Sequence, residues 1–238
     1  MAVAEKIYKE NILVDVPTIF VEGETDADFL KIAFAEHSDV LDNKIKNNEL
    51  RIVYKNDGAG TTTLVDWAIA WIYSGFKSKL FILFDKDEAG VKAKNEIEQN
   101  ELFVHKQNSV SVKLQHIEPS DEIISLLQKK IKFEFEIEHL LSTDIWKHIK
   151  ARGFEEARST EELLRMFNGL VSRDKPLDST IDDLVDNIDI RDTILSFAPK
   201  KLKKKKIVEL LNSNADKKKA TNGMKRTIQK IEEYFCHN

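Results

Sequence analysis

The chain has 238 residues, of which 42% are hydrophobic and 33% are charged, and its formal net charge is −4. This length suits one α/β domain of ordinary size with a smaller appendage, and the apolar content argues against an intrinsically disordered chain. A lone cysteine, Cys236, excludes an internal disulfide and a cysteine-based zinc site. No stretch approaches the roughly 20 apolar residues of a membrane span and the start does not resemble a signal peptide, so we expect a cytoplasmic protein with no membrane partner.

The charge is distributed unevenly along the chain. Residues 200–238 contain 12 Lys and Arg against 4 Asp and Glu, a net of +8, so the preceding residues carry −12. An acidic body with a basic C-terminal segment suits a protein that gathers cations in one place and meets phosphates in another. A solvated, charged helix is the alternative interpretation of this segment.

Strands and helices alternate along the first half of the chain. Thr18 to Val21 is apolar and β-branched and ends at Glu22-Gly23, which is typical of a buried strand that stops at a turn. The next stretch, 25–37, has helical apolar spacing, with Thr25 or Asp26 available as its N-cap. The pattern returns with strands expected at 51–54, 80–84 and 110–117, a glycine-rich turn at 56–60, and helices at 61–73 and 91–100. Such alternation predicts an α/β fold with a mainly parallel, Rossmann-like sheet flanked by helices.

After Pro119 the expected elements are mainly helices. Helices are expected at 121–130, 143–151, 160–167 and 180–197, and the alternating stretch 133–138 favours one further strand. We therefore expect an α/β domain over residues 1–142 and a helical extension with a basic C-terminus over residues 143–238.

Carboxylates follow two of the expected strands. Glu22 ends the first strand, and Asp85 and Asp87 come directly after the strand at 80–84. In parallel sheets functional residues gather at the carboxyl ends of the strands, so these side chains are expected to converge at one edge. Mg²⁺ prefers oxygen ligands and takes one or two carboxylates together with water and substrate phosphates. Each motif also has a common structural use, since Asp-x-Asp often caps a loop.

The order of these motifs from Thr18 to Gly90 resembles the Toprim family, whose members share a strand-end glutamate followed by glycine and, after a later strand, an Asp-x-Asp. The form EGETDADFL is most similar to the overcoming-lysogenisation-defect nucleases and related defence nucleases. This resemblance implies that Glu22, Asp26, Asp85 and Asp87 are metal ligands. The segment FEIEHLL is also similar to a motif of that branch, which implies that Glu138 binds a second metal ion; a helix-capping role for Glu138 is the alternative.

The same branch carries a lysine that stabilises developing negative charge. The resemblance implies such a catalytic lysine in the basic run, at Lys206 or Lys205. The run as a whole, Lys203, Lys204, Lys205 and Lys206, is expected to contact nucleic-acid phosphates without sequence preference.

The resemblance implies a metal-dependent endonuclease that uses one or two Mg²⁺ ions, or Mn²⁺, to cut phosphodiester bonds of DNA or RNA, with transfer RNA as one candidate substrate. No phosphate-binding loop of an ABC-type ATPase occurs in this sequence, so an ATPase partner would be a separate protein, as in two-component anti-phage defence systems. Release from it is expected to allow an active homodimer to form. Two alternatives remain open: a catalytically silent Toprim binding module, and another Toprim enzyme of DNA repair or RNA maturation.

Overall fold

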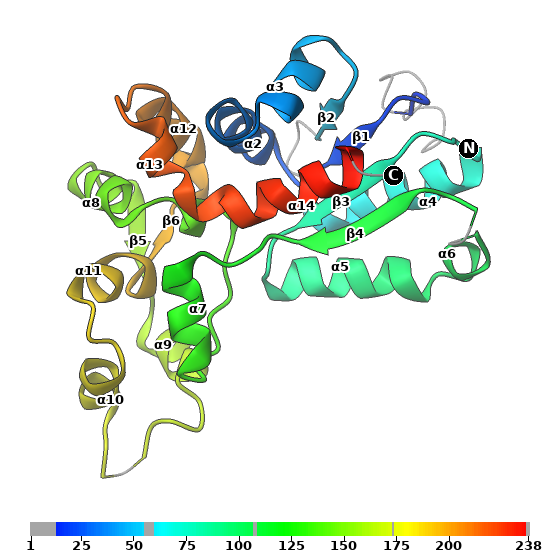
Figure 1. Cartoon of the computed structure of the whole chain (residues 1–238). Helices are drawn as coiled ribbons and strands as arrows, with labels where there is room; N and C mark the ends of the chain where they lie inside the picture. The colour runs from blue at the N-terminus through cyan, green and yellow to red at the C-terminus, as the bar shows by residue number, and fades with distance from the viewer. Residues whose placement is uncertain (1–12, 55–59, 107–108, 173, 237–238) are drawn as a thin grey trace. The chain divides into compact units, whose positions relative to one another are not determined.

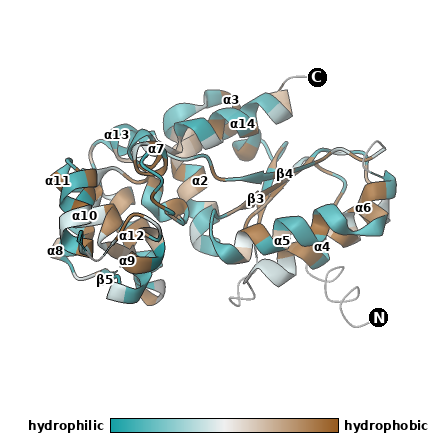
Figure 2. Ribbon diagram, turned by 90° about the horizontal axis from the view of Figure 1, so that it is seen from below, coloured by the Kyte–Doolittle hydropathy of each residue, from teal (hydrophilic) through white to brown (hydrophobic). Residues whose placement is uncertain are grey.

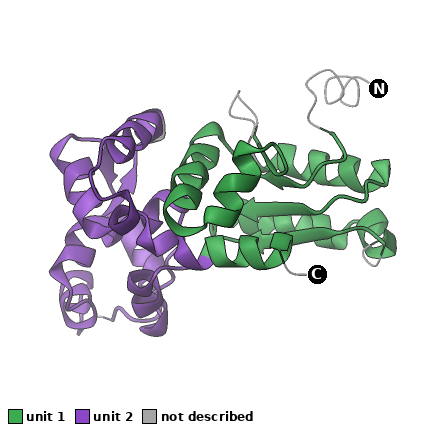
Figure 3. Ribbon diagram, turned by 45° about the horizontal axis from the view of Figure 1, so that its top comes forward, with its two compact units in different colours: residues 1–117, 227–238 green, residues 118–226 purple. Residues whose placement is uncertain are grey.

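The computed structural model describes residues 13–54, 60–106, 109–172 and 174–236 of the chain. The chain divides into two compact units (Figure 3). Unit 1 comprises residues 1–117 and 227–238, and unit 2 comprises residues 118–226. The sequence suggested a division after Ser142; the structure groups residues 118–142 with the helices that follow them, and it assigns the last helix to the first unit.

Unit 1 is built around a four-stranded, entirely parallel sheet, so the expected α/β fold is confirmed. The strand order is β2-β1-β3-β4. The sequence of β3, Leu-Phe-Ile-Leu-Phe, is buried along its whole length, as expected for a strand that is covered on both faces. The strands are β1 (Thr18–Phe20), β2 (Arg51–Val53), β3 (Leu80–Phe84) and β4 (Val112–His116).

Helices cover both faces of this sheet. Figure 1 and Figure 2 show α4, α5 and α6 on one face, with α2, α3 and α14 on the other. The two central strands are therefore covered on both faces, which explains why β1 and β3 are buried along their whole length. The outer strands β2 and β4 are only partly buried. The helices are α2 (Glu24–His37), α3 (Asp39–Lys46), α4 (Gly60–Ser74), α5 (Glu88–Gln99), α6 (Glu101–Lys106) and α14 (Lys225–Cys236).

Aromatic side chains fill the core on each side of the sheet. Phe20 of β1 meets Trp71 of α4 edge to face, with ring centroids 5.9 Å apart. Phe81 of β3 meets Tyr234 of α14, with ring centroids 5.6 Å apart. Nζ of Lys79 donates a hydrogen bond of 2.9 Å to the carbonyl oxygen of Tyr234, which holds the end of α14 beside β3. The last helix is thus an integral layer of unit 1.

Unit 2 consists mainly of short helices, with one small antiparallel sheet formed by β5 and β6. Its longer helices bury apolar residues at helical spacing, such as Ile145, Trp146 and Ile149 in α8. The elements are α7 (Asp121–Gln128), a 3₁₀ helix (Ile137–Leu140), α8 (Thr143–Ala151), β5 (Glu155–Ala157), α9 (Thr160–Met166), α10 (Leu177–Leu184), α11 (Ile188–Ile190), a π-helical turn (Arg191–Leu195), β6 (Phe197–Pro199), a 3₁₀ turn (Lys201–Lys203), α12 (Lys204–Asn212), α13 (Lys217–Ala220) and a 3₁₀ turn (Asn222–Met224).

Three local expectations were wrong. The stretch 133–138 is not a strand, although Phe133, Phe135 and Ile137 are buried in alternation: the chain is extended there and then enters the 3₁₀ helix. The helix expected at 180–197 is broken into α10, α11, the π-helical turn and the start of β6. The N-cap position of helix α2 is Gly23 rather than Thr25 or Asp26, and Asp26 lies at N3, where its side chain accepts a hydrogen bond from the Gly23 amide. Most of the expected turn at 56–60 lies outside the described residues.

Candidate active site

Glu22 and Asp85 follow neighbouring strands at the same edge of the sheet. Strands β1 and β3 pair in parallel with Phe20 opposite Ile82, and Glu22 and Asp85 come two and three residues later, respectively. The strand order reverses at this pair, since β2 lies beyond β1 and β4 lies beyond β3. In α/β sheets, ligands bind outside the carboxyl ends of the strands at such a reversal. Both side chains are half-buried, and Oε1 of Glu22 is shielded from solvent.

Two neighbouring residues fix the backbone of Asp85. Nδ1 of His116, at the end of β4, lies 2.9 Å from the carbonyl oxygen of Asp85. Burial lowers the pKa of His116, and the nearby Lys86 and Lys94 lower it further, so a neutral ring with the proton on Nδ1 donates this hydrogen bond. A Cβ atom at Gly90 would lie 2.3 Å from the same carbonyl oxygen. The backbone at Asp85 is therefore packed closely against the first turn of α5.

Asp87 and Asp26 have structural roles in helix capping. Oδ1 of Asp87 accepts a 2.7 Å hydrogen bond from the amide of Gly90, so Asp87 is the N-cap of α5. Oδ2 of Asp26 accepts a 2.9 Å hydrogen bond from the amide of Gly23, at the N-terminus of α2. Each of the two carboxylates thus uses one oxygen to satisfy the backbone at the start of a helix.

The donor set at this edge consists of carboxylate oxygens, which suits a hard divalent cation such as Mg²⁺. Within the described ranges, no three His, Cys, Asp or Glu side chains come together as a metal-binding group. Mg²⁺ does not require three protein ligands, because it retains several water molecules and is commonly held by one or two carboxylates. Glu22 and Asp85 are thus the carboxylates at this edge whose chemistry suits such an ion, and Asp26 and Asp87 also accept backbone hydrogen bonds at helix N-termini.

A second group of charged side chains lies inside unit 2. The Glu138 side chain is fully buried, and its Oε1 lies 2.9 Å from Nζ of Lys204. The same Nζ lies 2.7 Å from Oε2 of Glu136. Burial raises the pKa of Glu138, while Lys204 acts in the opposite direction. Lys204 is therefore the cation that compensates Glu138, the residue proposed from the sequence as a ligand of a second metal ion.

Histidine and arginine side chains extend this buried group. Nδ1 of His139 lies 3.0 Å from the amide nitrogen of Glu136, and Nε2 lies 2.9 Å from an Nη atom of Arg158. The His139 ring stacks on Trp146 with centroids 5.6 Å apart. Burial holds the pKa of His139 well below its ordinary value, and Arg158 and Lys204 add to this effect. The five residues Glu136, Glu138, His139, Arg158 and Lys204 are called the buried polar cluster below; Glu138 and His139 are buried, and the other three are half-buried.

The lysines of the basic run differ in their surroundings. Lys204 is part of the buried polar cluster, whereas Lys203, Lys205 and Lys206 are exposed. Lys206 lies 3.5 Å from Glu209 in the same helix. The structure therefore brings Lys204 to Glu138, while Lys203, Lys205 and Lys206 remain accessible to an extended phosphate backbone.

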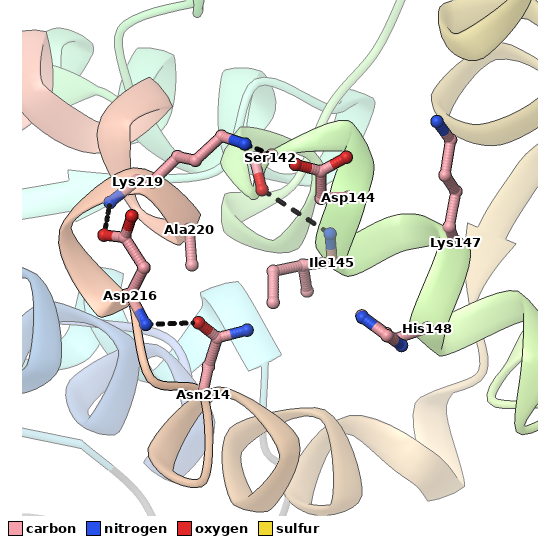
Figure 4. A pocket seen from close by; sticks show the side chains of 9 residues that line it. All are labelled: Ser142, Asp144, Ile145, Lys147, His148, Asn214, Asp216, Lys219 and Ala220. Carbon is pink, nitrogen blue, oxygen red and sulfur yellow. Dashed lines mark hydrogen bonds and ion pairs between the residues drawn. The ribbon is translucent and has the colours of Figure 1, made fainter.

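Unit 2 also contains an open cavity of about 430 Å³ between α8 and the segment that joins α12 to α13 (Figure 4). The two lysines that line the cavity already form ion pairs. Lys219 forms a 2.6 Å ion pair with Asp144, and Lys147 forms one of 2.8 Å with Asp189. Both lysines are therefore compensated, and Asp216, the other acidic residue of the lining, accepts a 2.9 Å hydrogen bond from the amide of Lys219.

Sequence reasoning singled out the carboxylates but missed His116, His139 and Arg158. His116 and Arg158 stand in no recognisable motif, and His139 lies within FEIEHLL without being singled out there. The contacts of His116 with Asp85 and of Arg158 with His139 join residues that are distant in the chain. The sequence did contain a signal for the capping role of Asp87. A glycine three positions after Asp87 is compatible with the N-cap that the structure shows.

No family model, curated protein or solved structure matches the chain. In the part of the chain that the structure describes, no helix is long and apolar enough to cross a membrane.

Proposed function

We propose that the chain is a metal-dependent endonuclease of the Toprim type, which cuts phosphodiester bonds of DNA or RNA, transfer RNA included. The observation that carries this proposal is the position of Glu22 and Asp85 at the carboxyl ends of the adjacent strands β1 and β3, where the strand order reverses. The sequence motifs around these residues resemble those of the overcoming-lysogenisation-defect nucleases, and the parallel sheet is compatible with that resemblance.

The residues at this edge have distinct roles in the proposed reaction. Glu22 and Asp85 would hold Mg²⁺ or Mn²⁺, and Asp87 would keep the loop between β3 and α5 in place through its cap on Gly90. A bound ion supplies Lewis-acid stabilisation of the phosphodiester oxygens and lowers the pKa of water. Asp26 orients the turn after Glu22 through its hydrogen bond to Gly23. The exposed Lys203, Lys205 and Lys206 would bind phosphates of the nucleic acid by charge.

The proposal includes control by a partner in the cytoplasm. A nuclease that reads no sequence would damage its own cell unless it were restrained. We assign this restraint to a separate ABC-type ATPase, as in two-component anti-phage defence systems, and we propose that release allows an active homodimer to form. Co-purification from the native host would recover the ATPase with the chain, whereas recovery of a free, monomeric and fully active nuclease would contradict this part of the proposal.

A cleavage assay tests the enzymatic proposal. The purified chain would be incubated separately with supercoiled plasmid, single-stranded DNA and total transfer RNA, with either Mg²⁺ or EDTA present. We expect at least one of the three substrates to be cut with Mg²⁺ and to remain intact with EDTA. Equal cleavage in EDTA would refute the metal dependence. Intact substrates in every reaction would refute the enzymatic proposal.

A non-catalytic Toprim module that binds nucleic acid is the second candidate. It is favoured by the capping roles of Asp87 and Asp26, which give these carboxylates a structural reason to be present. This candidate predicts nucleic-acid binding without cleavage in the same assay.

A further inference from the structure

The ring of His139 faces more hydrogen-bond donors than it can accept. The backbone amide of Glu136 lies 3.0 Å from Nδ1, and Nη2 of Arg158 lies 2.9 Å from Nε2, so a donor faces each ring nitrogen. A neutral imidazole has one acceptor nitrogen, and an imidazolium has none. His139 therefore cannot accept both hydrogen bonds. Because the amide belongs to the backbone that leads into the 3₁₀ helix, the arginine side chain is the donor left without an acceptor.

A second donor of Arg158, Nε, also lacks an acceptor. This atom is buried and has no hydrogen-bond partner among the described residues. Burial lowers the pKa of Arg158, and the charges of Glu162, Glu136 and Glu134 act in the opposite direction. In the described part of the chain no carboxylate reaches ion-pair distance from its guanidinium. Glu162 instead accepts a 2.7 Å hydrogen bond from the amide of Ser159. A half-buried arginine with unused donors needs an explanation.

The position of Arg158 suits recognition of an oxyanion. The guanidinium lies over the ring of Phe133, 5.4 Å from its centroid, and this contact fixes the plane without using any N–H group. The side chain is half-buried rather than enclosed, so a ligand can approach from solvent. A planar fork of N–H donors matches the oxygens of a phosphate, and Arg binds such groups in a bidentate manner.

We propose that Arg158 is a phosphate-binding residue of unit 2, which contacts a backbone phosphodiester of a bound nucleic acid. This inference deepens the proposed function and rests on it, because the ligand is a nucleic-acid phosphate. The arginine acts in binding and has no role in the cleavage step. In the absence of nucleic acid its donors face His139, and the phosphate supplies the acceptors that the ring cannot.

Binding of a fluorescent 20-nucleotide single strand, as DNA and as RNA, tests the inference in EDTA, so that no cleavage is needed. We expect Arg158→Gln to weaken binding by about tenfold and to lower the slope of log affinity against log salt by roughly 0.7, the value for one single-strand phosphate. Arg158→Lys keeps the charge and loses the fork, so we expect a several-fold loss with an unchanged slope. The matched control is Arg152→Gln, which removes an exposed arginine six positions away and should change binding less than twofold.

Each outcome of the binding experiment either supports or contradicts a phosphate-binding role for Arg158. Parental affinity and slope in both Arg158 variants would overturn the inference while leaving the proposed function intact, provided that the parent binds the strand and cleaves its substrate. A parent that binds neither strand and cleaves none of the three substrates would overturn both. If Arg158→Gln does not fold, Arg158→Lys decides alone, and parental binding by that variant would overturn the inference. Inorganic phosphate distinguishes the sources: Arg158-dependent stabilisation by phosphate, without any effect on strand binding, would assign the residue to a free anion instead.

Discussion

Nζ of Lys204 lies 2.9 Å from Oε1 of Glu138, whose side chain has no exposure to solvent. Removing one partner from a buried ion pair leaves the other charge uncompensated. We therefore predict that Lys204→Met lowers the free energy of unfolding by about 3 kcal/mol near pH 8, as measured by urea unfolding. Lys203→Met, at the exposed neighbour, is the control and should change it by less than about 0.5 kcal/mol. Equal effects of the two substitutions would contradict the importance of the pair.

The same variant has a defined pH dependence. Burial raises the pKa of Glu138 in the folded chain above its ordinary value, so the folded state binds the proton more tightly than the unfolded state. This contribution to stability is fully present below the unfolded pKa and is lost as the pH rises through the folded pKa. Lys204→Met raises the folded pKa further. Its destabilisation should therefore be smaller near pH 5 than near pH 8, and a pH-independent difference would contradict this assignment.

His139 gives the opposite pH dependence. Its folded pKa lies well below the ordinary value of 6.5, so the unfolded chain binds more protons once the pH falls below that value. The contribution to stability is present above pH 6.5 and is lost as the pH falls towards the folded pKa. When the pH is lowered from about 7.5 to about 5.5, the free energy of unfolding of His139→Gln should fall by about 1 kcal/mol less than that of the parent. His148→Gln, at an exposed histidine of α8, should follow the parent.

Loss of the carboxylates at the sheet edge should remove activity without unfolding the chain. We predict that Glu22→Gln and Asp85→Asn each reduce Mg²⁺-dependent cleavage to below about 1% of the parent, because each removes a charged metal ligand. Their thermal unfolding in EDTA should occur at or above the parental temperature, since like charges near one another repel. Glu88→Gln, at the exposed acid next to Asp87, is the matched control and should keep parental activity. Full activity in either ligand variant would eliminate the metal mechanism.

The three exposed lysines of the basic run should contribute affinity through charge alone. Replacing Lys203, Lys205 and Lys206 together with glutamine is predicted to flatten the salt dependence of duplex binding, by up to roughly 0.9 in slope for each phosphate that is no longer neutralised. The corresponding triple arginine variant keeps the charge and should keep the slope. Lys204 is left unchanged in both, because its pairing with Glu138 would confound binding with stability. An unaltered slope in the glutamine variant would favour the alternative interpretation, in which the run is only part of a solvated, charged helix.

Gly90 is predicted to be the glycine on which the Asp85 loop depends. A Cβ atom there would lie 2.3 Å from the carbonyl oxygen of Asp85, so Gly90→Ala must displace the loop, at a cost of about 1–3 kcal/mol, and should reduce cleavage strongly. Gly23→Ala is the comparison, because its Cβ would meet Oδ2 of Asp26 at an ordinary 3.6 Å. We expect it to unfold close to the parental temperature. Similar stability losses in the two variants would contradict the steric argument.

The sheet was predictable because its signals are local. Leu80 to Phe84 is a run of five apolar residues buried on both sides, and this burial produces a continuous hydrophobic stretch that no surface strand would carry. The position of Asp85 at the end of that strand followed from the same run. Helices such as α8, with Ser142 as its N-cap, also carry their boundaries in the sequence.

The buried polar cluster was not predictable, because its contacts join distant segments. Lys204 meets Glu136 from 68 positions away, and within a run of lysines nothing local distinguishes Lys204 from Lys205 or Lys206. The prediction of a strand at 133–138 was wrong for a related reason. Burial of one side produced a strand-like alternation, but the backbone pairs only at a single bridge residue, Phe135, and periodicity does not report on such pairing.

Helix α14 has a consequence for how the chain is made. It provides the rings of Tyr234 and Phe235 that cover Phe81, so the α/β unit needs residues from both sides of unit 2 in the sequence. During synthesis the ribosome has produced Glu22, Asp85 and the whole of unit 2 before this cover exists. A nascent or prematurely terminated chain would therefore display an incomplete sheet face. We therefore expect the α/β unit to be completed only after synthesis has passed α14.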